Sequence, residues 1–520
     1  MTVSRAAETD PLSDLKGARY AELQQMYEGL QAQFERGQLS EAELHAAFGV
    51  FWRPDPALNE PLNAWVQSYP ESYEAYTALG HWLLSRAWAM RGDEPVSRVT
   101  DLGWRGTLHF LEQADTCARH AVNLARNPLT AWLLIGRARN LAGCQMTLED
   151  VQEQRYPEWF SRPLAKNPRS LELRQLMLDH LRPEWGGSDE HMFAFVRQQE
   201  AGGQLGAGDI HRLWADYHAR VSHHALHFLN DLGEGVSRAH LAADMYEPHS
   251  EYLFVALTRA VAPDAERQGA LERYLHAAEQ NPALRPQSTF YWALYNSDRF
   301  LEPLLPRVAL LLSRWAASGT WAAAVALGRL TLLNRQWQLP DPLPLLRRAR
   351  DEGSREAAET IVYLQEEGLG LRAALTDSRT KRTDVLHAAE LSSPEMCWRV
   401  YQNFAPYREQ FSLDARQRYR YLLRAADTGH NDARYELAQQ LRAGNLEVGE
   451  DGVLRPVNTQ PLQQSLDYAR HLLERAAAED HPGALQALRT ARDTDWKADT
   501  ARRLRPHNLL DRLGGWRKKS

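Results

Sequence analysis

The stretch Leu422-Leu-Arg-Ala-Ala-Asp-Thr-Gly-His-Asn-Asp-Ala433 decides the fold, because it combines two helix-forming segments with the turn between them. Leu, Arg and Ala are strong helix formers. Gly429 supplies a backbone conformation that commonly ends a helix. The stretch therefore predicts a helix that ends near Gly429, a tight turn, and a second helix that starts just before the small packing residue Ala433.

The same pattern occurs three times in the C-terminal part of the chain. In each copy an Arg-Ala pair is followed by a turn residue and then by a second Ala at constant spacing: Arg348-Ala349, Gly353 and Ala357; Arg424-Ala425, Gly429 and Ala433; Arg475-Ala476, Asp480 and Ala484. The copies are 76 and 51 residues apart, which indicates insertions. The pattern resembles Sel1-like repeats, which are relatives of the tetratricopeptide repeat, and the resemblance implies stacked antiparallel helix pairs.

A second internal similarity lies in the N-terminal part. Ala75-Tyr76-x-x-Leu79-Gly80 recurs as Ala131-Trp132-x-x-Ile135-Gly136, 56 residues later. A Gly on the buried face lets a neighbouring helix approach closely, and the aromatic residue fills the space beside it. The two units resemble tetratricopeptide repeats, whose period is near 34 residues. The longer offset predicts an insertion, which we place around Arg91–Gly103.

Signals for strands are scarce along the rest of the chain. The segment Leu446–Val457, which contains Asp451-Gly452, is the one plausible short hairpin. The Asn-Pro pairs at 127–128, 167–168 and 281–282 predict helix starts with Asn as N-cap and Pro at the first helical position. We therefore predict an all-α protein, a tetratricopeptide/Sel1-like helical-repeat solenoid of stacked antiparallel helix pairs.

Composition and charge restrict the function classes. The 520 residues carry a net charge of −6, so no overall basic field favours nucleic acid. The exception is a basic C-terminal tail, which offers one route to nucleic acid or to an anionic membrane and is otherwise a solvated end dispensable for folding. The three cysteines form no CxxC pair, and neither a secretory signal nor a membrane span is visible. We expect a cytoplasmic protein.

These observations predict five regions. A flexible lead covers 1–15, a tetratricopeptide-like array covers 16–255, and a Trp-rich segment continues the helices over 256–340. Sel1-like repeats cover 341–495, and the basic tail covers 496–520. No Gly/Ser-rich linker separates these regions, which is typical of one continuous array.

One passage resembles a particular family. Leu181-Arg-Pro-Glu-Trp-Gly-Gly-Ser188, together with Tyr69-Pro-Glu-Ser72 and Ala87-Trp-Ala-Met-Arg-Gly92, is similar to an uncharacterised bacterial domain-of-unknown-function family with a Pro-x-Trp-Gly-Gly-Ser signature. The resemblance covers about 55–260. Glu184 stands where members usually carry Arg. The resemblance implies a tetratricopeptide-like fold and supplies no activity, no cofactor and no catalytic residue.

Four residues are our candidates for a partner site. Trp82 and Trp88 lie on different faces of one predicted helix, so that Trp82 can serve the core while Trp88 faces a groove. Arg91 ends that helix and carries a guanidinium suited to a carboxylate. Trp185 and Ser188 belong to a Gly-Gly turn, where Ser188 is a good N-cap. We predict that Trp88, Arg91, Trp185 and Ser188 border a binding groove, with a shaped structural turn as the alternative for Trp185–Ser188.

A His-rich helix over 209–231 supplies the second hypothesis. His223 and His227 are one turn apart, so both rings can reach one metal ion, but no HExxH motif or third ligand follows. Solvated or hydrogen-bonded histidines are the alternative. The chain also lacks a GxxxxGK[ST] loop and a GxSxG elbow.

We therefore predict a non-catalytic protein-interaction scaffold that needs no cofactor and holds a peptide or protein partner in a concave groove. Family-level analogy suggests an adaptor or an immunity-type partner in bacterial antagonism. The alternative is a metal-dependent hydrolase or metal-binding protein built on the His-rich helix. The sequence does not identify the partner.

Overall fold

The Arg-Ala pattern forms a helix-turn-helix at each of its three occurrences. In a computed structural model, Gly353, Gly429 and Asp480 each adopt positive φ, at +103°, +114° and +59°. The structure describes residues 10–91, 101–281, 284–297, 302–334, 339–367, 378–448, 454–457 and 461–491. These residues are almost wholly helical, which confirms the predicted all-α class. The chain divides into two compact units, Met1–Ala373 and Ala374–Ser520.

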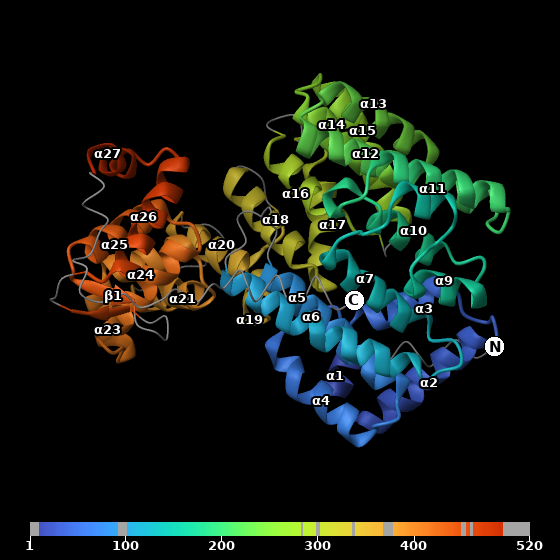
Figure 1. Ribbon diagram of the computed structural model, residues 1–520, viewed down its shortest axis with the longest axis horizontal. Coiled ribbons are helices and arrows are strands. Elements are labelled where there is room, and N and C mark those ends of the chain that lie inside the picture. The colour runs from blue at the N-terminus through green and yellow to red at the C-terminus, as the bar shows by residue number, and fades with distance from the viewer. Residues whose placement is uncertain are drawn as a thin grey trace. The chain divides into compact units, whose positions relative to one another are not determined.

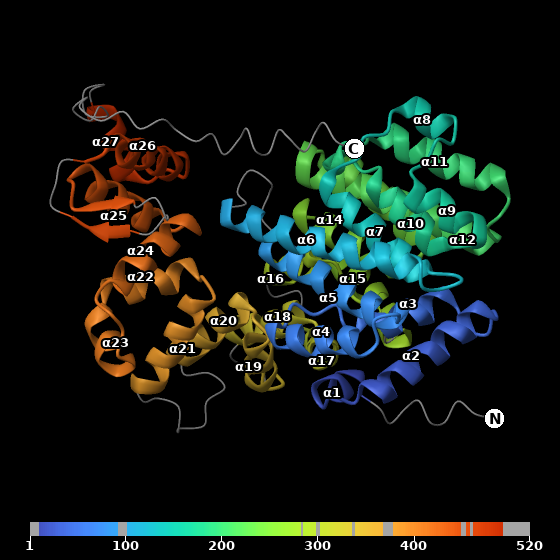
Figure 2. The same ribbon diagram turned by 60° about the horizontal axis from the view of Figure 1, so that its bottom comes forward.

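Eight helices of the first unit form a layer in which each helix packs against the next (Figure 1). This first layer contains α5 (Tyr73–Arg91), α7 (Leu129–Ala142), α10 (Leu171–His180), α12 (Ala207–His224), α14 (Ser250–Arg259), α16 (Ser288–Tyr295), α18 (Trp321–Leu333) and α20 (Arg355–Glu366). The helices that alternate with these along the chain pack against this first layer, as α6 does along α5 (Figure 2). They are α6 (Asp101–Val122), α9 (Glu158–Lys166), α11 (Asp189–Gly202), α13 (Leu232–Met245), α15 (Asp264–Gln280), α17 (Leu305–Ala317) and α19 (Leu343–Asp351).

Further helices and turns complete the first unit. Before the layers come α1 (Pro11–Lys16), α2 (Tyr20–Glu35), α3 (Glu41–Gly49), the 3₁₀ turn η1 (Pro56–Leu58) and α4 (Asn59–Ser68). Between them lie α8 (Leu148–Gln152), the 3₁₀ turns η3 (Pro183–Trp185) and η5 (Glu247–His249), and a π-helix, η4 (Ala225–Leu229).

The two motif glycines of the first layer sit where helices meet, as predicted. A Cβ on Gly80 would lie 3.0 Å from the Leu134 side chain, and one on Gly136 would lie 2.6 Å from the ring of Trp159. Only glycine allows α7 to approach its neighbours this closely. The predicted insertion between the two motif copies falls largely on residues 92–100, which lie outside the described residues.

The first unit has two separate clusters of buried apolar side chains. One runs from Leu15 to Val221 and the other from Leu226 to Leu364. The border between them falls on the π-helix η4, whereas the sequence analysis placed its region boundaries after 255 and 340. The irregular turn that follows α12 therefore coincides with the border between the two clusters.

The second unit repeats the helix pair. It contains α21 (Ser378–Glu390), α22 (Pro394–Gln402), α23 (Phe404–Phe411), α24 (Gln417–Asp427), α25 (Asn431–Arg442), α26 (Gln463–Ala478) and α27 (Pro482–Thr490). The predicted hairpin is present as β1 (Leu446–Val448) antiparallel to β2 (Leu454–Pro456), with Leu446 opposite Pro456. Asp451-Gly452 lies outside the described residues.

The repeated turn uses one set of backbone hydrogen bonds. The N–H groups of Ser354, His430 and His481 donate to the carbonyl oxygens of Ala349, Ala425 and Ala476 at 2.8–3.0 Å. The side chains of Ser354, His430 and His481 then cap the second helix of each pair. A fourth copy has the same geometry, with Ser392 at φ +64° and Ser393 bonded to Ala388. The sequence pattern does not reveal this copy, because His387, Ser392 and Met396 replace the Arg, the Gly or Asp, and the second Ala of the other copies.

The Asn-Pro pairs do not start helices as predicted. Asn167 and Asn281 are C-caps of α9 and α15, and Pro128 itself is the N-cap of α7. The amides of Asn127 and Asn167 hydrogen-bond to each other at 2.8–2.9 Å instead. This tertiary bond, 40 residues apart in sequence, satisfies the side chains and leaves the capping of α10 to Ser170.

Candidate partner-binding site

Three of the four predicted site residues come together at the end of α5. The Trp88 and Trp185 rings meet edge to face, with centroids 6.1 Å apart and planes at 82°. The Arg91 guanidinium lies 5.7 Å from the Trp88 ring centroid, within the range of a cation–π contact. All three side chains are half-buried. The two rings and the Arg91 guanidinium therefore present aromatic surface and a positive charge at one edge of the first layer.

The turn that carries Trp185 is fixed by close backbone packing. Gly186 adopts φ +97°, and a Cβ there would lie 3.0 Å from the carbonyl oxygen of Cys144. At Gly187 a Cβ would lie only 2.0 Å from the carbonyl oxygen of Leu181. The Cys144 N–H donates to the Trp185 carbonyl, which ties this turn to the end of α7. Both glycines are thus required by the backbone, and they hold Trp185 against Trp88.

Ser188 has a capping role. Its hydroxyl accepts the His191 N–H at 3.3 Å as the N-cap of α11, and it lies 2.7 Å from the Nδ1 atom of His191. This is the structural role that its sequence context predicts. The structure joins Ser188 to the helix rather than to the aromatic pair.

Glu184, where the resembling family usually has Arg, is held in an ion-pair cluster. Its carboxylate accepts two hydrogen bonds from Arg182, at 3.0 and 3.2 Å, and lies 3.3 Å from Nδ1 of His223. Burial alone would raise its pKa, but the hydrogen bonds from His223 and Arg182 bring the pKa well below its usual range. The carboxylate is therefore ionised and links η3 to α12.

The predicted metal ligands lie beside cations. The rings of His223 and His227 are 4.6 Å apart, but Arg182 contacts the first ring at 3.2 Å and Arg259 the second at 3.5 Å. Burial, His223 and Arg259 lower the pKa of His227 to about 4. Across the described part of the chain, no three His, Cys, Asp or Glu side chains converge as a metal site would require. The described residues therefore add no third ligand to His223 and His227.

A hydrogen-bonded polar track that the sequence analysis did not find crosses the first layer. Asp216 on α12 accepts hydrogen bonds from Gln175 and His249, both at 2.7 Å. Arg220 donates to Asp179 at 2.7 Å and lies 3.5 Å from Asp216. Burial favours a raised pKa for Asp216, but the His249 hydrogen bond and the Arg220 charge lower it to about 2. No local spacing signals this track, because its members come from two helices, α10 and α12, and the 3₁₀ turn η5.

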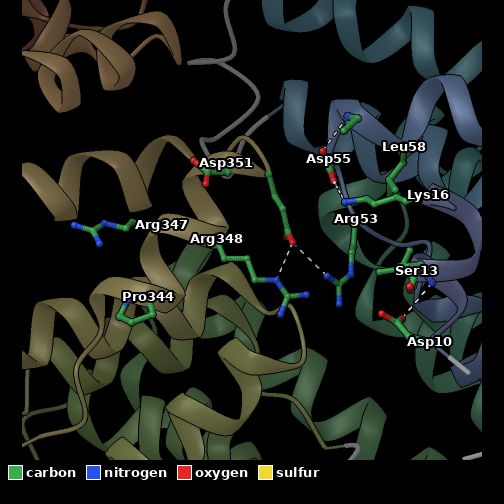
Figure 3. A pocket seen from close by; sticks show the side chains of 13 residues that line it. Asp10, Ser13, Lys16, Arg53, Asp55, Leu58, Pro344, Arg347, Arg348 and Asp351 are labelled. Carbon is green, nitrogen blue, oxygen red and sulfur yellow. Dashed lines mark hydrogen bonds and ion pairs between the residues drawn. The ribbon is translucent and has the colours of Figure 1, made fainter. Parts of the chain in front are cut away.

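A cavity of about 620 Å³ lies where the first helix of the unit meets α19 (Figure 3). Arg53 and Lys16 enter from one wall and Arg348 from the other (Figure 3). Each of these cations has an acidic partner: Arg53 lies 3.4 Å and Arg348 3.1 Å from Glu352, and Lys16 lies 3.3 Å from Asp55. Arg53 also donates to the Ser318 carbonyl at 3.0 Å. The ion pairs of the cavity thus connect its two walls, and Arg53 and Glu352 are 299 residues apart in sequence.

The fold and these clusters define a helical-repeat protein with packed helix pairs. Within the part of the chain described, no helix is long and apolar enough to cross a membrane. Residues 12–146 match the family described as "Domain of unknown function (DUF4034)". This range includes Tyr69–Ser72 and Trp88 but ends before the Trp-Gly-Gly-Ser turn, so the match differs from the range of 55–260 that the resemblance suggested.

Two solved structures are similar at low identity. A Sel1 repeat protein from Oxalobacter formigenes is 14% identical, with 57% of this chain and 90% of that chain covered and a TM-score of 0.32. A protective antigen of uropathogenic Escherichia coli displaying an SLR fold is 13% identical, with 82% and 80% covered and a TM-score of 0.32. No curated protein matches this chain. The helical-repeat architecture rests on the chain's own helix pairs and turns.

Proposed function

We propose that this chain is a non-catalytic interaction scaffold that binds a peptide or protein partner at the edge of its first layer. The observation that carries the proposal is the cluster of Trp88, Arg91 and Trp185, where two half-buried rings meet edge to face beside a guanidinium. Trp and Arg dominate binding energy at protein interfaces, especially when partly desolvated. Stacked helix pairs also hold such residues on a rigid frame, which lowers the entropy lost on binding.

The position of the cluster supports this function. Trp185 is held by the Gly186-Gly187 turn, and Trp88 by the last turns of α5. The turn that fixes Trp185 needs two glycines at its strained positions. A rigid aromatic pair at a helix end is suited to receive one apolar side chain of a partner, with Arg91 beside it for a polar group.

The experiment compares capture of a partner by four full-length proteins: the wild type, Trp88→Ala, Arg91→Ala and the control Arg105→Ala. Arg105 is an exposed residue of α6. The partner is a protein enriched by the wild type from a lysate of the source cells and then purified for direct binding. We expect Trp88→Ala and Arg91→Ala to weaken binding about 30-fold, equivalent to about 2 kcal/mol, and Arg105→Ala to leave it unchanged.

Melting curves show whether the variants remain folded. Retention of the partner at wild-type strength by folded Trp88→Ala and Arg91→Ala would place the site elsewhere. Ser188→Ala separates the two roles considered for that residue: loss of the cap lowers stability by about 1 kcal/mol, and binding should be unchanged. An adaptor or immunity role within this proposal predicts that a secreted effector is encoded beside this chain.

A further inference from the structure

A second cluster in the first unit contains a cation that no carboxylate contacts. Arg137 on α7 is half-buried, and its one hydrogen bond goes to Nε2 of His45, at 2.8 Å. Its guanidinium lies 5.7 Å from the ring of Trp52, which is 36% exposed. Among the described residues, Arg137 forms no ion pair with a carboxylate. Arg53 and Arg220, two other enclosed arginines of the unit, each have one.

The two histidines beside Arg137 add further unmet hydrogen-bond donors. A guanidinium only donates, so Nε2 of His45 accepts and Nδ1 carries the proton. That Nδ1 is buried without a partner. His81, whose ring centroid is 5.8 Å from that of His45, is fully buried and has no partner for either ring nitrogen. Burial lowers the pKa values of both histidines, so both are neutral near pH 7 and each offers one N–H.

Leaving such donors unsatisfied is costly. A buried polar group without a hydrogen bond costs about 1–3 kcal/mol, and a charged one costs more. This cluster therefore contains a guanidinium that contacts no carboxylate and two imidazole N–H groups that have no hydrogen-bond acceptor. An anionic oxygen ligand supplies what the cluster lacks.

We propose that the cluster of His45, Trp52, His81 and Arg137 is a subsite for a carboxylate of the bound peptide, either an Asp or Glu side chain or the C-terminal group. This inference rests on the proposed scaffold function and names the chemistry of the partner. Arg137 holds the carboxylate by charge-assisted hydrogen bonds, and the unpartnered imidazole N–H groups of His45 and His81 make the surroundings favourable to an acceptor. The exposed Trp52 ring packs on the apolar part of the same or the neighbouring residue.

The surrounding charges favour a carboxylate over a phosphate. Glu172 and Asp179 on α10 act electrostatically on Arg137 without contacting it. Two nearby acidic groups penalise a dianion more than a single negative charge. One guanidinium with neutral histidines matches a monoanion, whereas phosphate sites usually gather several cations or backbone N–H groups.

The test uses four pools of fluorescent nine-residue peptides with randomised apolar and polar positions. The first has free C-termini and no Asp or Glu, the second is amidated and contains Asp, the third is amidated without acidic residues, and the fourth is amidated and contains phosphoserine. Binding to the full chain is measured by fluorescence anisotropy for the wild type and for Arg137→Gln, Arg137→Lys and Arg139→Gln. Arg139 is the matched control, on the same helix and 39% exposed, 3.7 Å from Asp115.

We expect the first or the second pool to bind at least about 10-fold more tightly than the third. Arg137→Gln, which can still donate to His45, should abolish that difference, and Arg137→Lys should reduce it because the planar fork is lost. Arg139→Gln should behave as the wild type. A preference for the free C-terminus over internal Asp, or the reverse, identifies which carboxylate is bound.

Three results would overturn the inference. The first is a loss of the expected acid preference or of its dependence on Arg137. The wild type would then bind the acid and amide pools equally, or an Arg137→Gln protein that melts normally would keep the acid preference. The second is a preference for phosphoserine. In either case the scaffold function stands if binding still depends on Arg91. The third is no binding of any pool by the wild type, which counts against both the subsite and the scaffold function.

Discussion

The turn at Gly187 should be intolerant of even one added carbon. In Gly187→Ala the Cβ would lie 2.0 Å from the Leu181 carbonyl oxygen and 2.5 Å from its carbon. Both atoms belong to the backbone, so no side chain can rotate away. The turn must open by at least about 1 Å to bring the contact to 3.0 Å, below which Cβ contacts are essentially never found.

Opening the turn affects two hydrogen bonds. The Gly187 N–H donates to the Arg182 carbonyl at 3.0 Å, and the neighbouring Trp185 carbonyl accepts from Cys144. Each bond contributes about 1 kcal/mol, and the residual strain adds about another. We therefore expect a loss of about 3 kcal/mol. With an unfolding entropy of about 2.1 cal/mol/K per residue over the first unit, this lowers the melting temperature of that unit by about 4 °C.

The control is Gly269→Ala in the interior of α15, where no atom lies within 4 Å of the added Cβ. Ala is the better helix former, so this variant should gain about 0.5–1 kcal/mol. Differential scanning calorimetry of both variants measures the contrast. A Gly187→Ala protein that melts within 1 °C of the wild type would refute the close packing described for the Trp-Gly-Gly-Ser turn.

Three further predictions follow from other sites. Glu352→Gln keeps an acceptor for the Trp321 indole but removes the charge that faces Arg53, in an ion pair whose side chains are both 12% exposed. It should lower the free energy of unfolding, measured by denaturant titration, by about 1–2 kcal/mol. Glu158→Gln, in an exposed pair with Arg162, should lower it by less than about 0.5 kcal/mol. Burial raises the pKa of Glu251 to about 8, so the protonated carboxyl stabilises the fold fully below about pH 4.5, and this stability is lost as the pH rises through 8. In Glu251→Gln, the fall in the free energy of unfolding between pH 5 and 9 should be smaller than in the wild type by more than about 1 kcal/mol. An unchanged pH profile would contradict the assignment. Removal of residues 499–520 should leave the melting temperature unchanged, and a large fall would show that the basic tail is docked.

Local sequence was sufficient for the helix pairs because each turn is determined by neighbouring residues. The Arg-Ala pattern predicts its turn because the positive-φ residue, the capping residue and the small Ala all lie within nine positions. It failed at Ser392, where a residue less suited to positive φ adopts the same turn because the packed Ala388 and the Ser393 cap determine it. The Asn-Pro pairs misled because Asn is acceptable at either end of a helix.

In the candidate sites, too, local sequence predicts some residues and misses those that only helix packing brings together. Trp88 and Trp185 were selected separately, and the structure brings them into contact because the η3 turn that carries Trp185 is bonded to Cys144 just after α7, the helix that packs beside α5. Arg137 was missed because α7 is mostly apolar, and nothing in its sequence distinguishes Arg137 from Arg139 two positions later. Its significance comes from His45, Trp52 and His81, which precede it by 56 residues or more and reach it only through helix packing.

The ion pair between Arg53 and Glu352 also bears on how the chain is made. Arg53 leaves the ribosome 299 residues before its partner. At a synthesis rate of about 5–20 residues per second, about 15–60 s pass between the synthesis of Arg53 and that of Glu352. During that interval the walls of the later cavity face solvent, and the growing chain is an open array rather than the closed unit. The last step of assembly is therefore set by the rate of translation, and slow synthesis of residues 54–352 would lengthen the period in which a chaperone can bind the unfinished edge.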